Sequence, residues 1–391
     1  MIKLFRQLQR RTPLGWLQLK HEKSRLLVAL AGIAFADVLM FMQLGFQASL
    51  YDSNTRVSRA MEGDIVLISP KALNLQNLST LPRRRLLQAQ DVPGVEDASA
   101  LYVSNLTWKN PQTRLNATVQ VLGFAPDEPA FALPEVNQQL DKLKLPDTVL
   151  FDRKARGKYA EAIAQLEQGK TLTTEVDRRT LTLAGVFSLG ASFGADANLL
   201  TSDQTFQRLF PRRDPASISL GLLHLEPGYD AQEVAAALEQ HLPEDVRVLT
   251  RAEFVQFEEN YWRVASPIGF VFGLGTVMAF VVGVVIVYQV LSTDVNAHLQ
   301  EYATFKAMGY SNGYLLSIVF EEAIVLAFLG FVPGVILPLG LYAVAAKATA
   351  LPIYMTASRA MLVLGLTLIM CVLSGAIATR KLQSADPADM F

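Results

Sequence analysis

The sequence predicts an α-helical membrane protein with four transmembrane helices, in which a large mixed α/β extracytoplasmic domain separates the first helix from the other three. Two observations support this fold class. Four runs of residues are nearly free of charge, and each has the ~20 residues that a helix needs to cross the hydrocarbon core of a bilayer. The charged residues are concentrated between the first two runs, which enclose 23 of the 35 basic and 28 of the 36 acidic side chains.

Composition narrows the class of protein further. The 391 residues are 51% hydrophobic and only 18% charged, whereas a soluble domain carries about 25% charged residues. The net charge of −1 argues against a nucleic-acid-binding surface. A single cysteine, Cys371, and four histidines exclude a disulfide framework and a Cys-rich zinc site. We therefore expect no metal site and no cofactor in this chain.

The four charge-poor runs predict the membrane helices. The first run contains one acidic residue, Asp37, and it is too long and starts too late in the chain to be a cleaved signal peptide. The predicted transmembrane helices cover 26–51, 264–293, 313–346 and 360–379.

The basic residues predict the orientation in the membrane. Seven Lys or Arg residues and only one Glu lie in 1–25, which places the N-terminus in the cytoplasm. The same segment alternates basic and apolar side chains, and this predicts an amphipathic helix on the inner leaflet. Because four spans return the chain to the starting side, residues 380–391 are expected to form a cytoplasmic tail.

Residues 52–263 form the predicted extracytoplasmic α/β domain. This insertion carries a net charge of −5 and is long enough to bury its own core, and we predict two lobes, with 125–215 as the second. Near its end, a strand, an amphipathic helix and a strand at 217–225, 231–241 and 245–250 suggest half of a ferredoxin-like fold. Further strands are predicted at 63–69, 117–124, 148–152 and 179–189.

Candidate catalytic motifs fail on inspection. Gly169-Lys170-Thr171 resembles the end of a phosphate-binding loop, but that motif needs a glycine where this chain has Ala164. No pairing of a nucleophile with a base is recognisable in the sequence. We therefore expect no catalytic residues and predict that the chain is not an enzyme.

Three acidic residues lie inside the predicted spans. Asp37 is near the middle of the first span, where a carboxyl group is costly, and both a functional group and a packed, hydrogen-bonded residue are consistent with the position. Glu321 and Glu322 lie near the start of the third span, where packing or solvation at the interface is the favoured interpretation.

Two pairs of glycines are spaced by four residues in the spans. They are Gly269 and Gly273 in the second span and Gly330 and Gly334 in the third. Such spacing lets helices approach closely. Packing within the chain is the favoured interpretation, and a homodimer interface is the alternative.

The stretch EYATFKAMGYS at 301–311 resembles the E-x-x-x-x-K-A-x-G-x-S motif of permeases in the MacB/FtsX superfamily. In that family the motif forms a short cytoplasmic coupling helix, here within 294–312, that docks on an ATPase subunit. Glu322 with Gly330 and Gly334 also resembles the E-x7-G-x3-G pattern of the family's third helix. The resemblance implies a MacB-like fold. It also implies ATPase contacts at Glu301, Tyr302, Thr304, Phe305, Lys306, Ala307, Met308 and Gly309.

Four further stretches, at 12–19, 34–41, 63–70 and 108–111, resemble the DevC permeases of cyanobacterial glycolipid exporters. This resemblance implies the permease subunit of a tripartite ABC efflux system in a bacterial inner membrane. Its implied partners are a second copy of the chain, a separate ATPase that binds ATP and magnesium, a periplasmic adaptor, a TolC-like outer-membrane channel reached indirectly, and membrane lipids. The implied mechanism is mechanotransmission, in which ATP hydrolysis moves the periplasmic domain.

Two alternatives remain within the same superfamily. One is an FtsX-like relay that controls a periplasmic partner, and the other is a lipoprotein-releasing permease. The large size of the 52–263 insertion favours the exporter over a simple relay.

Overall fold

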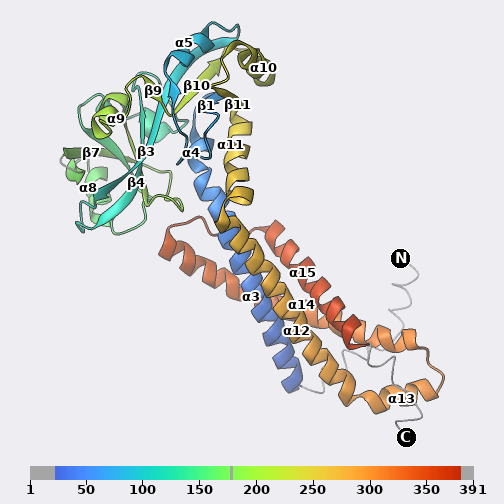
Figure 1. Cartoon of the computed structure of the whole chain (residues 1–391). Helices are drawn as coiled ribbons and strands as arrows, with labels where there is room; N and C mark the ends of the chain where they lie inside the picture. The colour runs from blue at the N-terminus through green and yellow to red at the C-terminus, as the bar shows by residue number, and fades with distance from the viewer. Residues whose placement is uncertain (1–22, 177–178, 380–391) are drawn as a thin grey trace. The chain divides into compact units, whose positions relative to one another are not determined.

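The computed structural model describes residues 23–176 and 179–379 (Figure 1). The amphipathic helix predicted at 1–25 lies almost entirely outside these residues, and the predicted tail at 380–391 lies wholly outside them. The chain divides into two compact units. We call Met1–Gln47, Phe270–Ala345 and Ile353–Phe391 the helical unit, and Ala48–Gly269 with Ala346–Pro352 the α/β unit.

Within the described residues, four helices are long and apolar enough to span a membrane. Together with the mixed α/β insertion after the first of them, they confirm the predicted fold class. The long helices share one apolar cluster, in which Ile33, Leu291, Ala327 and Met370 each come from a different helix. The helices are α3 (Lys23–Asn54), α12 (Pro267–Ala297), α14 (Asn312–Thr349) and α15 (Ala357–Ala378), with the short α13 (Leu299–Ala307) between α12 and α14.

The α/β unit is built on one large sheet, which has nine strands among the described residues in the order β11-β1-β10-β3-β4-β8-β5-β7-β6. The strands are β1 (Ile65–Ile68), β3 (Val95–Lys109), β4 (Asn116–Phe124), β5 (Thr148–Asp152), β6 (Leu172–Val176), β7 (Arg179–Phe187), β8 (Ala197–Ser202), β10 (Leu220–Leu225) and β11 (Arg247–Thr250). A short antiparallel pair, β2 (Leu81–Pro82) and β9 (Ser217–Ile218), forms a separate two-stranded sheet.

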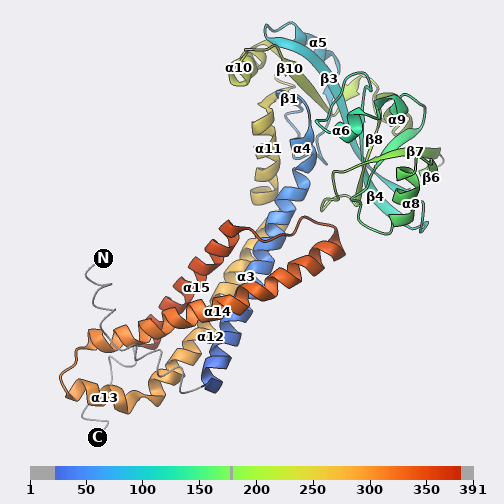
Figure 2. The ribbon, with the colours of Figure 1, turned by 180° about the vertical axis from the view of Figure 1, so that it is seen from behind.

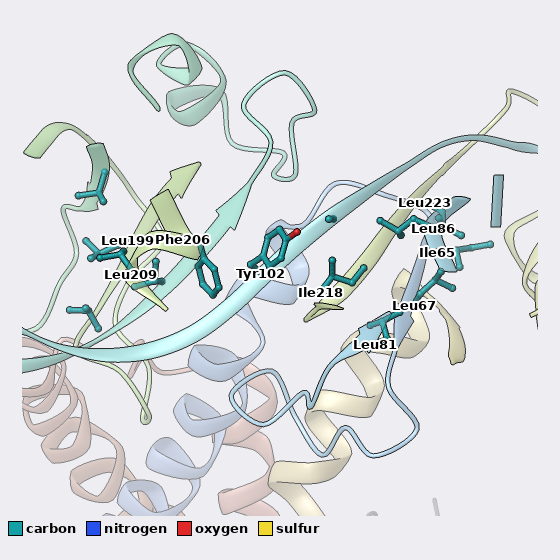
Figure 3. Close-up of a cluster of buried hydrophobic side chains, with 14 of the residues drawn as sticks. Ile65, Leu67, Leu81, Leu86, Tyr102, Leu199, Phe206, Leu209, Ile218 and Leu223 are labelled. Atoms are coloured by element: carbon teal, nitrogen blue, oxygen red, sulfur yellow. The ribbon is translucent and has the colours of Figure 1, made fainter. Parts of the chain in front are cut away.

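Helices cover both faces of the sheet, so the strands β1, β5 and β8 are buried on both sides. In β1, Ile65 and Leu67 belong to one apolar cluster, part of which Figure 3 shows, whereas Val66 and Ile68 belong to the other. The helices are α4 (Arg56–Ala60), α5 (Arg84–Gln90), α6 (Pro134–Asn137), α7 (Leu140–Leu143), α8 (Ala160–Glu167), α9 (Asp203–Leu209), α10 (Ala231–His241) and α11 (Arg251–Asn260), which continues as the π-helix η1 (Tyr261–Ala265).

The first part of the sheet has ferredoxin-like connectivity. Strands β10 and β11 flank β1 and are both antiparallel to it, so β10-α10-β11 is a split β-α-β unit, as the sequence predicted. The unit β1-α5-β3 interleaves with it in the order β11-β1-β10-β3. The two units together complete a ferredoxin-like βαββαβ arrangement, into which the chain between β3 and β10 is inserted.

The long strand β3 joins this arrangement to the insertion. Its first half pairs with β10 and its second half with β4, and Leu101 takes part in both pairings. Residues 125–215, predicted as a second lobe, supply β5 to β8, which extend the same sheet beyond β4. Figure 2, which views the ribbon from behind, shows β3 and β4 side by side.

Candidate functional site

The predicted coupling segment contains the short helix α13, which ends in a Schellman motif. The Gly309 N–H donates to the Lys306 carbonyl at 3.0 Å, and the Tyr310 N–H donates to the Phe305 carbonyl at 3.1 Å. This motif requires a positive φ at the residue after the C-cap, and Gly309 has φ of 91°. The rings of Phe305 and Tyr310, 5.7 Å apart, supply the apolar contact that accompanies such a cap. The glycine of the K-A-x-G sequence therefore ends the helix.

One face of α13 is buried. Tyr302 and Ala303 are only 2% and 3% exposed. Tyr302 packs in an apolar cluster with Val295 of α12 and with residues of α14, namely Leu315, Ile318 and Val319. This packing fixes α13 between the two long helices.

The other side of α13 is exposed, as is its C-cap residue Met308, whose exposed fraction is 60%. The predicted contact residues that lie on this side are Glu301, Thr304, Ala307, Met308 and Gly309, while Phe305 and Lys306 are half-buried. Tyr302, which was also among the predicted contact residues, faces inward and packs α13 against its neighbours.

A second site surrounds Asp37 in the core of the helical unit. Asp37 is fully buried, and the Thr367 hydroxyl of α15 lies 2.6 Å from its Oδ1. The same hydroxyl is 2.8 Å from the Val363 carbonyl, so its single proton can serve only one of the two acceptors at a time. Within the described part of the chain, no hydrogen bond reaches Oδ2 of Asp37.

The glycines of α14 make room for α3 at this site. A Cβ atom placed on Gly334 would lie 2.7 Å from the Cβ of Asp37, and one placed on Gly330 would lie 2.7 Å from the Cβ of Ile33. Both distances are too short for real atoms. This pair therefore allows a close approach between two helices of the same chain.

The other predicted pair has different surroundings. A Cβ on Gly273 would meet only Gln47, at an ordinary 3.8 Å, and one on Gly269 would overlap the Trp262 carbonyl oxygen of the preceding helical turns.

The two adjacent glutamates also differ, since Glu322 is 1% exposed and Glu321 is half-buried.

Sequence reasoning missed a buried carboxylate in the α/β unit. Asp152 ends β5, is fully buried, and accepts four hydrogen bonds. Its Oδ1 receives the N–H groups of Lys154 and Leu189 at 3.0 and 3.1 Å. Its Oδ2 receives the Gly190 N–H at 2.7 Å and the Asn198 side-chain amide at 2.9 Å. This carboxylate therefore fixes the loop between β7 and β8.

Arg156 ties the same loop to the last residue of α14. Its Nε donates to the Thr349 carbonyl at 2.7 Å, and Nη2 donates to the Ser192 carbonyl at 2.7 Å. Nη1 lies 3.3 Å from a carboxylate oxygen of Asp196. No periodicity or motif marks this arginine in the sequence, because its partners are distant along the chain.

The sequence that resembled a phosphate loop is a helix end. Gly169 has φ of 79° and follows α8, and its N–H donates to the Leu166 carbonyl. In the parts of the chain that the structure describes, no group of three or more His, Cys, Asp or Glu side chains gathers to hold a metal ion.

Comparison with known proteins finds a family model that matches part of the chain. Residues 273–387 match the model described as the FtsX-like permease C-terminal family. The C-terminal helices match an FtsX-like permease domain. The matched range contains α13, both glycines of α14 and the Thr367 hydroxyl, so it covers the exposed face described above.

Two curated relatives and two solved structures are similar to the chain. An uncharacterized ABC transporter permease of Mycobacterium tuberculosis, from strains CDC 1551 and H37Rv, is 24% identical over 304 residues, which are 76% of this chain and 75% of each relative. The periplasmic region of MacB from Actinobacillus actinomycetemcomitans is 13% identical, with a TM-score of 0.34, and covers 54% of this chain and 98% of that chain. The extracellular domain of the noncanonic ABC-type transporter YknZ from Gram-positive bacteria is 12% identical, with a TM-score of 0.29, over 48% and 100%.

The permease matches support a membrane subunit of a transporter. They agree with the predicted superfamily resemblance at this coarser level.

Proposed function

We propose that the chain is the permease subunit of a tripartite ABC exporter in a bacterial inner membrane. A separate ATPase hydrolyses ATP with magnesium, and the resulting movement passes through the helical unit to the periplasmic α/β unit by mechanotransmission. The exported material is a glycolipid or a similar envelope substrate, as in DevC-type systems. The working form is a homodimer with a periplasmic adaptor that connects to a TolC-like channel.

The observation that carries this proposal is the exposed face of α13. A helix that is pinned by Tyr302 on one side, and closed by Gly309 at its end, presents a fixed surface to a partner. The same residues fall inside the range that matches a permease family. In this proposal 294–312 is the cytoplasmic coupling segment, 52–263 is the periplasmic domain, and both termini are cytoplasmic.

The buried groups of the helical unit also favour mechanotransmission. Asp37 is enclosed by Thr367 and Gly334. Glu322 is likewise almost fully buried. A conduit for a polar substrate needs charged or polar side chains that face water, and these residues do not face water.

Co-purification of the ATPase subunit tests the docking surface. We expect Met308→Lys to lower recovery of the co-expressed cognate ATPase at least tenfold, because it places a charge on the exposed apolar part of α13. A cation at a helix C-terminus is compatible with the helix dipole, so the helix itself is expected to persist. Leu115→Lys is the matched control, since Leu115 is 70% exposed in the α/β unit and outside the proposed surface.

The control is expected to retain wild-type recovery and wild-type stimulation of ATP hydrolysis. Undiminished recovery with Met308→Lys would remove α13 as the docking element, and an equal loss in both variants would show a general effect of the added charge.

A further inference from the structure

A small polar cavity lies in the α/β unit, beside the C-terminal end of α3, β4, α11 and η1. Its volume is about 10 Å³, which is room for about one water molecule. Four of its lining residues each have a buried side-chain oxygen or nitrogen with no hydrogen-bond partner among residues 23–176 and 179–379. They are Asn54 of α3, Gln120 of β4, Glu258 of α11 and Trp262 of η1.

The helices beside this cavity lose regular α geometry at the same level. Helix α3 ends at Asn54 and α4 begins at Arg56, while α11 passes into the π-helix η1 at Tyr261. Figures 1 and 2 show α4 and α11 side by side. Turns of π-helix are rare and occur frequently at functional sites. Because Asn54 lies near the beginning of the segment Ala48–Gly269 and Trp262 near its end, the cavity joins two distant parts of the α/β unit.

The four polar side chains are almost completely withdrawn from solvent, with exposed fractions of 1% to 7%. The amide of Asn54 is oriented by its own helix, since its Nδ2 donates to the Leu50 carbonyl at 2.8 Å. That bond leaves Oδ1 as the atom without a partner. A buried polar group that makes no hydrogen bond is costly. Four such groups beside one cavity therefore indicate a polar occupant.

The hydrogen-bonding capacity of the four groups identifies the occupant. Trp262 Nε1 can only donate, and Asn54 Oδ1 can only accept. Glu258 Oε1 accepts when the carboxyl group is charged and donates when it carries the proton, and the Gln120 amide can turn to present Nε2 or Oε1 in response. In both states the cavity offers two donors and two acceptors, which one water molecule complements. A cation gains nothing from the Trp262 N–H, and an anion gains nothing from the Asn54 oxygen.

We propose that this cavity binds one water molecule, which forms hydrogen bonds with all four side chains and so connects α3, β4, α11 and η1. When Glu258 is charged, the water donates to Asn54 and Glu258 and accepts from Gln120 and Trp262. When Glu258 is protonated, it donates to the water, and Gln120 accepts. Buried waters commonly satisfy polar groups in this way. The proposal concerns the α/β unit alone, so it does not depend on the proposed function.

X-ray radiolytic labelling of the full-length protein, read by mass spectrometry, tests the proposal. X-rays convert water into hydroxyl radicals that attack the nearest side chains, so a bound water marks a buried residue beside it. We expect Trp262 to be oxidised at least fivefold faster than Trp108, which is the internal reference. Trp108 is also buried, but its Nε1 already donates to the Tyr159 hydroxyl at 3.4 Å.

Two variants separate a bound water from other causes of labelling. Asn54→Leu replaces the carboxamide with an apolar group of similar size, and apolar cavities stay dry, so we expect labelling of Trp262 to fall at least fivefold. Ser53→Ala is the matched control, because Ser53 also lines the cavity but its hydroxyl already donates to the Leu50 carbonyl at 3.3 Å. It is expected to keep wild-type labelling. Unfolding would instead raise the labelling of both Trp262 and Trp108.

Equal labelling of Trp262 and Trp108 in the wild type, unchanged labelling of Trp262 in Asn54→Leu, or an equal loss in Ser53→Ala would overturn the proposal. A bound monovalent cation is tested by thermal unfolding in the chloride salts of sodium, potassium and choline at equal concentration. We expect the same unfolding temperature in all three. A higher temperature in sodium or potassium that Asn54→Leu abolishes would show a cation site and overturn the assignment to water.

Discussion

Two fully buried aspartates, one in each unit, are stabilised to very different degrees. Asp152 in the α/β unit accepts four N–H groups at 2.7 to 3.1 Å. Asp37 in the helical unit has only the Thr367 hydroxyl, which it shares with the Val363 carbonyl. Four donors satisfy the hydrogen-bonding capacity of the buried Asp152 carboxyl group, whereas a single shared donor leaves that of Asp37 largely unsatisfied.

The difference indicates different roles. Asp152 organises the loop that carries Leu189 and Gly190, so its contribution is to the stability of the α/β unit. The Asp37–Thr367 arrangement accommodates either direction of hydrogen bonding, because a protonated Asp37 can donate to Thr367 while Thr367 donates to Val363. Asp37 is therefore less constrained by its hydrogen bonds than Asp152.

The same substitution at both positions tests this contrast and has the largest expected effect. Asp152→Asn replaces one of the two acceptor oxygens with an amide NH₂ that faces existing donors, so we expect the free energy of unfolding to fall by about 3 kcal/mol. Asp37→Asn keeps an acceptor for Thr367, and we expect a change below about 1 kcal/mol. Thermal unfolding of the full-length protein in detergent, followed by tryptophan fluorescence, measures both. Equal losses at the two positions would contradict the contrast.

The close approach of Gly334 to Asp37 gives the next largest effect. Gly334→Ala places a methyl group 2.7 Å from the Cβ of Asp37, and overpacking of this kind costs about 1–3 kcal/mol. Asp37→Gly removes the Cβ together with the carboxyl group and leaves space beside that methyl. A double-mutant cycle is expected to show that the two losses in stability are not additive. Additive losses would mean that Gly334 matters for another reason.

Glu258 of α11 is a third buried carboxyl group, and it extends the comparison to the pH dependence of stability. It is 1% exposed, its Oε1 has no hydrogen-bond partner among the described residues, and it lines a small cavity with Asn54 and Trp262. Burial raises the pKa of Glu258 to about 8, against 4.5 for an ordinary glutamate, although a hydrogen bond from the Leu75 backbone opposes the shift.

Stability is therefore expected to fall as pH rises, because the folded protein keeps this proton up to about pH 8 while the unfolded chain releases it near pH 4.5. The stabilisation that the protonated Glu258 provides is complete below the pKa of the unfolded chain. Above that pKa it falls by about 1.4 kcal/mol per pH unit, and it is lost once the pH exceeds the pKa of the folded protein. Glu258→Gln is expected to remove this slope. Unfolding of both proteins at pH 6 and pH 8 gives the comparison, and parallel pH profiles would refute the role of Glu258.

The membrane helices could be predicted because freedom from charge over about 20 residues is a signal in the linear sequence itself. Local patterns were also sufficient for β5 and α10, whose bounds, Thr148–Asp152 and Ala231–His241, are the predicted ones. The longest strand, β3, was missed. Its consecutive residues from Ala100 to Val103 are all buried, because helices cover both faces of the sheet, so the strand shows no alternation there.

The sites divide in the same way. The location of α13 could be predicted because a short sequence motif marks it, and Gly309 is recognisable as the glycine of that motif. The partners of Asp37 and Asp152 were not predictable, because Thr367 lies 330 residues from Asp37 and Asn198 lies 46 residues from Asp152. Contacts of this kind depend on the fold as a whole.

The interleaved ferredoxin-like arrangement has a consequence for how the protein is made. Strand β1 (Ile65–Ile68) is synthesised early, yet its neighbours β10 and β11 are encoded after the whole insertion. Pairings between distant segments form slowly, and an unpaired apolar strand is prone to aggregation in the meantime. During synthesis β1 must therefore wait for the end of the domain, so a nascent chain that stops within the insertion exposes a strand without its partners. Protection of that strand until β11 has emerged is a requirement that this topology places on biogenesis.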